Sequence, residues 1–167
     1  MADVKHAVIR TDKMMGTTVD TYLYSVLFKK NGSGASIDNG NLVQITKLDE
    51  DNREVFEAEA PASGAKLSDL AVTAGVVLFY DESVRHYEDE WVNEADRPLR
   101  AYALHSGCMF GLTAEAYNGT PEKDKFVDFE VGKTTFKVAD SATASTIGKI
   151  VEVETIGRYT YYVIRIA

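Results

Sequence analysis

The sequence has one cysteine, three prolines and no long uncharged apolar run, and these shortages exclude several classes of protein. With Cys108 alone, the chain can form neither an intrachain disulfide framework nor a multi-cysteine zinc site, so packing must support the fold. Because the start MADVKHAVIRTDK has no apolar core region and no apolar run reaches about eighteen residues, we expect no secretion signal and no membrane span.

Basic residues are also in short supply. The chain has 18 Lys and Arg against 26 Asp and Glu, which gives a net charge of −8. Contact with phosphates needs clustered Lys and Arg, so the balance argues against nucleic acid as a partner. An acidic surface favours solubility instead.

Alternation of apolar and polar residues is the main signal that is present. The chain has 167 residues, the length of one domain that can bury roughly 70% of its unfolded surface. TYLYSVLFK places Tyr24, Val26 and Phe28 on one face, as in a half-buried strand. RYTYYVIRI, near the end, has β-branched or aromatic residues on both faces, which predicts a strand covered on both sides or lying against a partner. The sequence therefore predicts an all-β fold, a compact antiparallel β-barrel or sandwich with short helical turns. Strands are expected near residues 21–29, 41–48, 53–58, 75–81, 99–105, 107–113, 126–131, 133–138, 149–156 and 158–166.

Glycines between apolar residues predict several connections. VGKT (131–134) and IGRY (156–159) place Gly where a type II′ turn needs it, so both are expected to be two-residue hairpins. IGKI (147–150) is expected to mark a strand entry or a bulge. Together they predict a meander of about four strands in the C-terminal third. KLSDLAV and TAEAYNG are the stretches expected to form single helical turns.

Two segments interrupt the strand pattern. Residues 1–20 are expected to form an N-terminal arm that docks on a neighbour, or an ordered first strand, ahead of a single β domain over residues 21–167. Residues 81–98, DESVRHYEDEWVNEADRP, form a polar and aromatic excursion that is long for a hairpin loop. Because loops of this length tend to be functional, the excursion is a candidate contact surface. GVVLFYD (75–81), just before it, is a continuous apolar run that predicts a central strand.

The stretch SIDNGNLVQIT (36–46) has two interpretations, an acidic metal loop or a turn that starts a strand. A calcium loop needs oxygen ligands at alternating positions and ends in a bidentate Glu. Here the sequence becomes apolar directly after the turn, at Leu42 and Val43, so a turn with positive φ at Asn39 and Gly40 is favoured. LHSGCMFGLT (104–113) has the same layout and the same interpretation.

Neither of the possible reactive clusters forms a recognisable motif. The carboxylates and His86 between residues 81 and 90 would matter only in a cleft at a defined separation, which no spacing fixes, and a solvated loop anchored by Tyr87 and Trp91 is favoured. His105 and Cys108 are three apart at a strand entry and would not converge, so we expect Cys108 to be a small core residue. With no phosphate loop, nucleophile elbow or zinc motif, we expect no enzyme, cofactor or metal.

The order of several stretches resembles a known family. IDNGNLVQI, REVFEAEAP, the apolar run with YDES, RAYALHSGCMFGLTAEAYNGTP and TASTIGKIVEVETIGRYTYYVIRI are similar to small proteins encoded beside the major capsid protein of tailed bacteriophages. These proteins look like capsid decoration, or cement, proteins, and the similarity covers residues 37–167. It implies a virion structural protein without an active site, located on the outer capsid surface, whose partner is the major capsid protein, with self-association on the shell also open.

The resemblance and the sequence together give a hypothesis for the contact surface. The N-terminal arm and the excursion would face the shell, because the arm is partly apolar and basic and Tyr87 and Trp91 offer rigid contact area. A carbohydrate- or cell-surface-binding β-module is an alternative, for which Tyr87, Trp91 and Tyr102 are the available aromatics, and a small β-barrel hydrolase is a more distant one. The candidate capsid contacts are Lys5, Val8, Ile9, Arg10, Tyr87 and Trp91.

Overall fold

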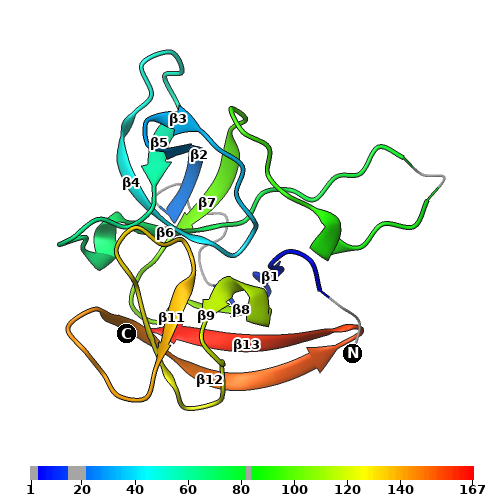
Figure 1. Cartoon of the computed structure of the whole chain (residues 1–167), viewed down its shortest axis with the longest axis vertical. Coiled ribbons are helices and arrows are strands. Elements are labelled where there is room, and N and C mark those ends of the chain that lie inside the picture. The colour runs from blue at the N-terminus through cyan, green and yellow to red at the C-terminus, as the bar shows by residue number, and fades with distance from the viewer. Residues whose placement is uncertain (1–3, 15–21, 82–83) are drawn as a thin grey trace.

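The computed structural model describes residues 4–14, 22–81 and 84–167 and shows an all-β fold (Figure 1). Five strands form a closed barrel in the order β2-β5-β4-β6-β7, because β7 pairs with both β6 and β2. Most neighbours are antiparallel, whereas β2 and β5 run parallel. The barrel strands and the short β3, which pairs with β2, are β2 (Leu23–Lys30), β3 (Ser33–Gly34), β4 (Leu42–Leu48), β5 (Phe56–Glu59), β6 (Leu70–Thr73) and β7 (Leu99–Ala103).

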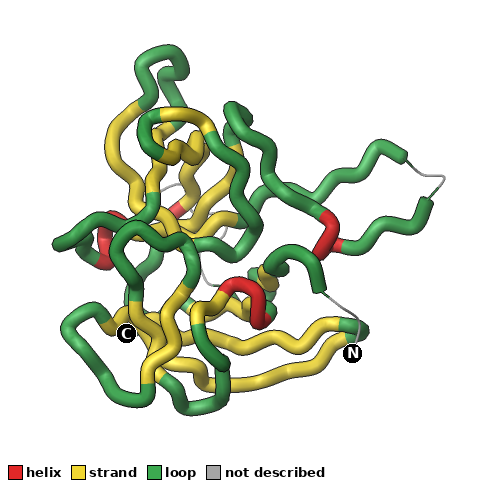
Figure 2. Tube along the Cα trace, viewed as in Figure 1, coloured by secondary structure: helices red, strands yellow, loops and turns green. Residues whose placement is uncertain are grey.

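A second sheet of seven strands lies against the barrel, in the order β1-β8-β13-β12-β10-β11-β9 (Figure 1). Its centre is the long antiparallel hairpin of β12 and β13, and among the described strands of this sheet only β9 and β11 pair in parallel. The strands are β1 (Ile9–Arg10), β8 (Met109–Leu112), β9 (Tyr117–Asn118), β10 (Phe126–Asp128), β11 (Phe136–Ala139), β12 (Thr146–Ile156) and β13 (Tyr159–Ile166). Figure 2 shows that short 3₁₀ turns are the helical content of the described chain, at η2 (Leu67–Asp69), η3 (Glu88–Glu90) and η4 (Ala114–Ala116).

Alternation along the barrel strands builds two cores. In β6, Ala71 points into the barrel, while Leu70 and Val72 point outward. The outward residues pack against the second sheet, where Phe110 and Ile164 are fully buried. Successive side chains of a strand point to opposite faces, so a strand that is covered on both faces is apolar throughout. This explains why the barrel strands that face the second sheet have little polar content.

The last strand confirms the prediction that it is covered on both sides. Ile164 and Ile166 of β13 face the main core, and Tyr159 and Tyr161 face the opposite side. There the aromatic rings pack against Val8 of the N-terminal segment. The segment therefore covers a face that the barrel leaves open.

The predicted turns have different outcomes. IGRY is confirmed as a two-residue hairpin, since Ile156 pairs with Tyr159 and Gly157 has a φ of 62°. IGKI is confirmed as a bulge, because Val127 pairs with Gly148 while the next residue, Asp128, pairs with Thr146, so the register shifts between them. VGKT is wrong as a two-residue hairpin: β10 ends at Asp128 and β11 begins at Phe136. The simple meander is also wrong, because β10 lies between β11 and β12.

The expected helical turns are confirmed at η2 and η4, and the turns IDNGN and LHSGC are confirmed as the starts of β4 and β8. Gly40 and Gly107 have φ values of 78° and 84°, which favour glycine, whereas the positive φ expected at Asn39 is absent. A central strand over residues 75–81 is wrong. β6 already has β4 and β7 as neighbours in a closed barrel, so the barrel has no edge for this run. The run leaves the body in extended form and has no strand partner among the described residues (Figure 1).

Cys108 lies in the main core, fully buried, and burial raises the pKa of its thiol to about 11. We expect the Cys108→Ala variant to lose about 1 kcal/mol of unfolding free energy, since a small apolar group leaves a close-packed site. We also expect the native thiol to resist a thiol-specific reagent until the protein unfolds, because the thiolate is the reactive form. Chemical denaturation and thiol titration test both points, and rapid labelling of native protein would contradict the assignment.

Candidate functional site at the base of a projecting loop

Residues 75–81 and 84–91, here called the projecting loop, extend away from the body of the molecule (Figure 1). Of the eight large apolar side chains that are exposed in the described part of the chain, four lie on this loop. Val76, Leu78 and Tyr80 are 60%, 49% and 87% exposed, and Val84 is 57% exposed. Exposed apolar side chains gathered on one segment mark an interaction site more often than the same residues scattered singly.

The two ends of the loop are held together at the turn that starts β4. The Asn39 side chain accepts a hydrogen bond from the Gly75 amide at 2.7 Å and donates one to the Gly75 carbonyl at 3.0 Å. Asn93 donates from Nδ2 to Asn39 Oδ1 at 2.9 Å and to the Ile37 carbonyl at 2.9 Å. Asn39 and Asn93 are buried, so this asparagine clamp fixes where the loop leaves and rejoins the body.

A buried carboxylate anchors the returning part of the loop. Asp89 is 1% exposed, and its Oδ1 accepts a hydrogen bond of 2.6 Å from the Tyr159 hydroxyl. Its Oδ2 accepts one from the Lys5 amide at 3.2 Å and lies 3.7 Å from Arg158 Nη2. Burial acts to raise the pKa of Asp89, but these donors outweigh it and the pKa lies below its ordinary value. Burial and the hydrogen bond to Asp89 raise the pKa of Tyr159 to about 12.

The anchor brings the N-terminal segment and the loop into one groove, here called the arginine–tyrosine groove. The Arg158 guanidinium lies 3.9 Å from the centre of the Tyr87 ring, and the Arg85 guanidinium lies 5.3 Å from the same ring. Arg10 lies 5.4 Å from the centre of the Tyr161 ring. Cations at these distances are attracted by the ring faces, which holds them in place. The groove has a volume of about 1000 Å³ and is lined by Ile9, Arg10, Arg85, His86, Tyr87, Glu88, Ile156, Gly157, Arg158, Tyr159 and Tyr161.

On its other side the loop borders a second hollow, here called the apolar cleft, between residues 75–80 and strands β2 and β7 of the barrel. Its volume is about 620 Å³. Phe79 lies inside the loop, stacked on His86 at 4.4 Å and edge-on to Trp91 at 5.5 Å. The apolar side chains that line the cleft are Leu23, Tyr24, Val76, Leu78, Phe79, Tyr80, Trp91 and Leu99.

The structure brings together some of the contact residues expected from the sequence and separates others. Ile9, Arg10 and Tyr87 meet in the arginine–tyrosine groove, whereas Trp91 lies at the apolar cleft. Lys5 is exposed and forms an ion pair of 3.1 Å with Glu90 at the loop base, which lowers the pKa of Glu90. Val8 is 4% exposed and packs against the chain's own tyrosines, so its side chain is not available to a partner.

The expected N-terminal arm is in part an ordered strand. Ile9 and Arg10 form β1 and pair with β8, and Ala7 is buried in the main core. Asp38 accepts hydrogen bonds from this segment, at 2.9 Å from His6 Nδ1 and 3.5 Å from the Ala7 amide, so its carboxylate has a structural partner. Residues 1–3 and 15–20 of the expected arm lie outside the described residues.

The carboxylates between residues 81 and 90 do not converge on a cleft where the structure describes them. Asp89 faces the anchor and Glu90 faces Lys5 and His86, while Glu88 is exposed at the groove, and Glu82 lies outside the described residues. Over residues 4–14, 22–81 and 84–167, no three His, Cys, Asp or Glu side chains are grouped as metal ligands would be. In the same ranges no helix is long and apolar enough to span a membrane.

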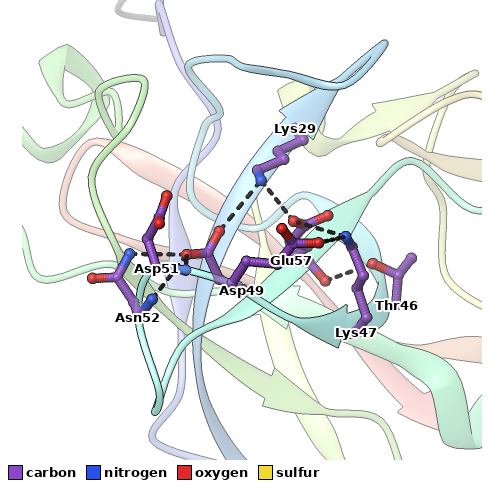
Figure 3. A network of polar contacts seen from close by, with 8 residues as sticks. Lys29, Thr46, Lys47, Asp49, Asp51, Asn52 and Glu57 are labelled. Carbon is purple, nitrogen blue, oxygen red and sulfur yellow. Dashed lines mark hydrogen bonds and ion pairs between the residues drawn. The ribbon is translucent and has the colours of Figure 1, made fainter.

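The densest polar network of the barrel has a structural explanation (Figure 3). Lys29 donates to Glu57 at 2.7 Å and to Asp49 at 3.3 Å, and Lys47 lies 3.5 Å from Glu57. The hydrogen bond between Lys29 and Glu57 contributes most to both pKa shifts: the pKa of Lys29 is raised and the pKa of Glu57 is lowered. Asp49 accepts a further bond of 3.0 Å from the Asn52 side chain. Because two lysines already neutralise the two carboxylates, the network joins β2, β4 and β5 and offers no cation site.

The sequence interpretation missed Arg85 and Arg158, because a single arginine in a loop or a turn has no distinctive pattern. In the folded chain, five of the seven arginines line the two hollows beside the projecting loop, namely Arg10, Arg85, Arg97, Arg100 and Arg158. Arginine is enriched at protein interfaces, and its clustering becomes visible only once the chain is folded.

Comparison of the chain with protein-family models, with curated proteins and with solved structures gave no match.

Proposed function

We propose that this protein is a non-enzymatic structural protein that binds the outer surface of a phage capsid and decorates or reinforces the shell. The observation that carries the proposal is the convergence of the N-terminal segment and the projecting loop on the arginine–tyrosine groove. Arginine and tyrosine are among the residue types that contribute most to protein interfaces, and both line this groove. A protein that acts by contact needs such a surface and no catalytic site.

The arrangement favours a partner surface with carboxylates. Arg85 is exposed and has no ion pair in the described part of the chain, so its guanidinium is free to pair with an acceptor. Of the three arginines that line the groove, Arg10 pairs with Asp12 at 2.6 Å and Arg158 lies 3.7 Å from Asp89. Arg85 is therefore the arginine of the groove that would pair with a carboxylate of an acidic shell.

The carbohydrate-binding alternative requires exposed aromatic rings over one groove. Tyr102 is 5% exposed in the main core, and Tyr87 and Trp91 lie at different hollows. The three rings therefore do not form a common platform, and the capsid proposal is the better supported of the two.

The proposal is tested by adding purified protein to undecorated capsids of the phage whose head region encodes it and measuring the bound fraction after sedimentation. We expect Arg85→Ala to weaken binding at least tenfold, since truncation of an arginine that acts as a hot spot at the centre of an interface costs about 2 kcal/mol or more. The matched control is Arg53→Ala, which removes an exposed arginine that does not line the groove and should change binding less than twofold.

Full-length protein that stays in solution while the capsids sediment would reject the proposed function. Equal binding by the Arg85→Ala and Arg53→Ala variants would reject the part assigned to the groove. Point variants are preferable to removal of residues 1–13, because Ala7 and Val8 are buried and truncation would also disturb the fold.

A further inference from the structure

Residues 76–80, the outgoing limb of the projecting loop, have the properties of a β-strand that has no partner in the described part of its own chain. All five are apolar, and β-branched or aromatic residues predominate, as in VVLFY. They run extended, and no hydrogen bond joins their backbone to the rest of the described chain. An apolar strand with free backbone groups is a template for pairing with another chain.

The limb is also held ready for pairing. The asparagine clamp fixes its start at Gly75, and Phe79 is packed on His86 and Trp91. Val76, Leu78 and Tyr80 line the apolar cleft and are 60%, 49% and 87% exposed, whereas Phe79, which also borders the cleft, is packed on its neighbours within the loop. Because the extended form is already fixed, little further conformational entropy is lost when a second strand pairs with it.

We propose that this limb pairs with the same limb of a second copy of the chain, antiparallel and two-fold symmetric, with Leu78 opposite Leu78. The inference goes beyond the proposed function and does not depend on capsid binding. In this register Val76 of each copy lies opposite Tyr80 of the other, and paired residues share one face of the ribbon. Tyr80, which is 87% exposed in the single chain, is then placed at the body end of the other copy's apolar cleft.

The charges favour this partner and this direction. No charged residue lies between Gly75 and Tyr80, so the limb can pair without burying a charge. Antiparallel pairing places the two Asp81 residues at opposite ends of the ribbon, about 20 Å apart for six residues at the rise of a strand. Parallel pairing would place them side by side, where like charges are destabilising.

The shape of the molecule allows two acidic copies to approach in this way. Each chain carries a net charge of −8, so close contact between the bodies would be repulsive. The loop projects from the body (Figure 1). Antiparallel pairing of two limbs would therefore place the two bodies at opposite ends of the ribbon. A two-fold dimer of this kind is the commonest symmetric assembly and uses the same surface on both partners.

Disulfide trapping tests both the pairing and its register. Residues directly opposite in an antiparallel pair have Cα atoms about 4.5–5.5 Å apart, which a disulfide can bridge. Under mild oxidation we expect full-length Leu78→Cys to form a covalent dimer at least tenfold faster than the control Val131→Cys, whose site is 57% exposed but lies off the loop. Native Cys108 is buried and does not contribute.

Sedimentation velocity of the unmodified protein provides a second readout. We expect reversible dimers that Leu78→Lys weakens at least tenfold and Val131→Lys leaves unchanged. The proposal would be overturned if the wild-type protein were monomeric at every concentration and Leu78→Cys formed a disulfide-linked dimer no faster than Val131→Cys. It would also be overturned if the limb paired only with capsids and not with a second copy. Faster trapping of Val76→Cys with itself than of Leu78→Cys would overturn the register and the proposal with it.

Discussion

Replacing Asp89 with alanine is expected to lower the free energy of unfolding by about 3 kcal/mol, because it removes a buried carboxylate and leaves its donors without an acceptor. The Tyr159 hydroxyl and the Lys5 amide lose hydrogen bonds of 2.6 Å and 3.2 Å, and Arg158 loses its ion pair. The measurement is urea denaturation at neutral pH. A protease should also cleave the variant faster than the wild type around the groove, because Asp89 joins the loop to β13 and to the N-terminal segment.

The control for Asp89 is Asp140, whose exposed carboxylate pairs with Lys125 at the surface. Exposed ion pairs contribute little, so Asp140→Ala should cost less than about 1 kcal/mol. Equal losses in the two variants would show that the anchor is not a buried pair in solution.

The same anchor gives a pH dependence of known sign. The folded-state pKa of Asp89 lies below its ordinary value of 3.8, so the charged form contributes stability that is fully present above 3.8. This contribution is lost as the pH falls through the folded pKa. The difference in unfolding free energy between the wild type and Asp89→Asn should therefore shrink between neutral pH and pH values below 3.8. A difference that widens on acidification would contradict the assignment.

Removing the asparagine clamp is expected to have the second largest effect. Asn93→Ala should cost about 2 kcal/mol, because the Ile37 carbonyl and Asn39 Oδ1 each lose a buried donor. Denaturation measures the loss, and limited proteolysis should show faster cleavage within the projecting loop. A second route is Gly75→Ala, since a Cβ there would lie 1.9 Å from Asn93 Oδ1 and force the clamp apart.

Asn118→Ala is the matched control for the clamp. Its exposed side chain makes one hydrogen bond, of 3.0 Å, to Glu130. This variant should change neither stability by more than about 0.5 kcal/mol nor the cleavage of the loop. Unchanged proteolysis in Asn93→Ala would mean that the clamp does not hold the loop.

Several features of the fold follow from the sequence by itself. Alternation determines strands because successive side chains point to opposite faces, and this predicted the strands that build β2, β4, β12 and β13. Glycine at the first turn position predicted the hairpin at Gly157, since a positive φ is costly for other residues. The burial of Cys108 follows from the apolar run around it. These are local properties, and each depends on a few neighbouring residues.

Only the tertiary structure determined what the apolar run 75–81 does and where the contact residues meet. The run has the composition of a central strand, but whether a strand is central depends on its neighbours, and the closed barrel leaves none for it. Val8 and Arg10 are two residues apart, yet one is buried beneath β13 and the other lines the groove. Tyr87 and Arg158 are 71 positions apart in sequence and in contact in space. Period and propensity act over a few residues, whereas a binding surface is built by pairing between distant segments, which no local pattern encodes.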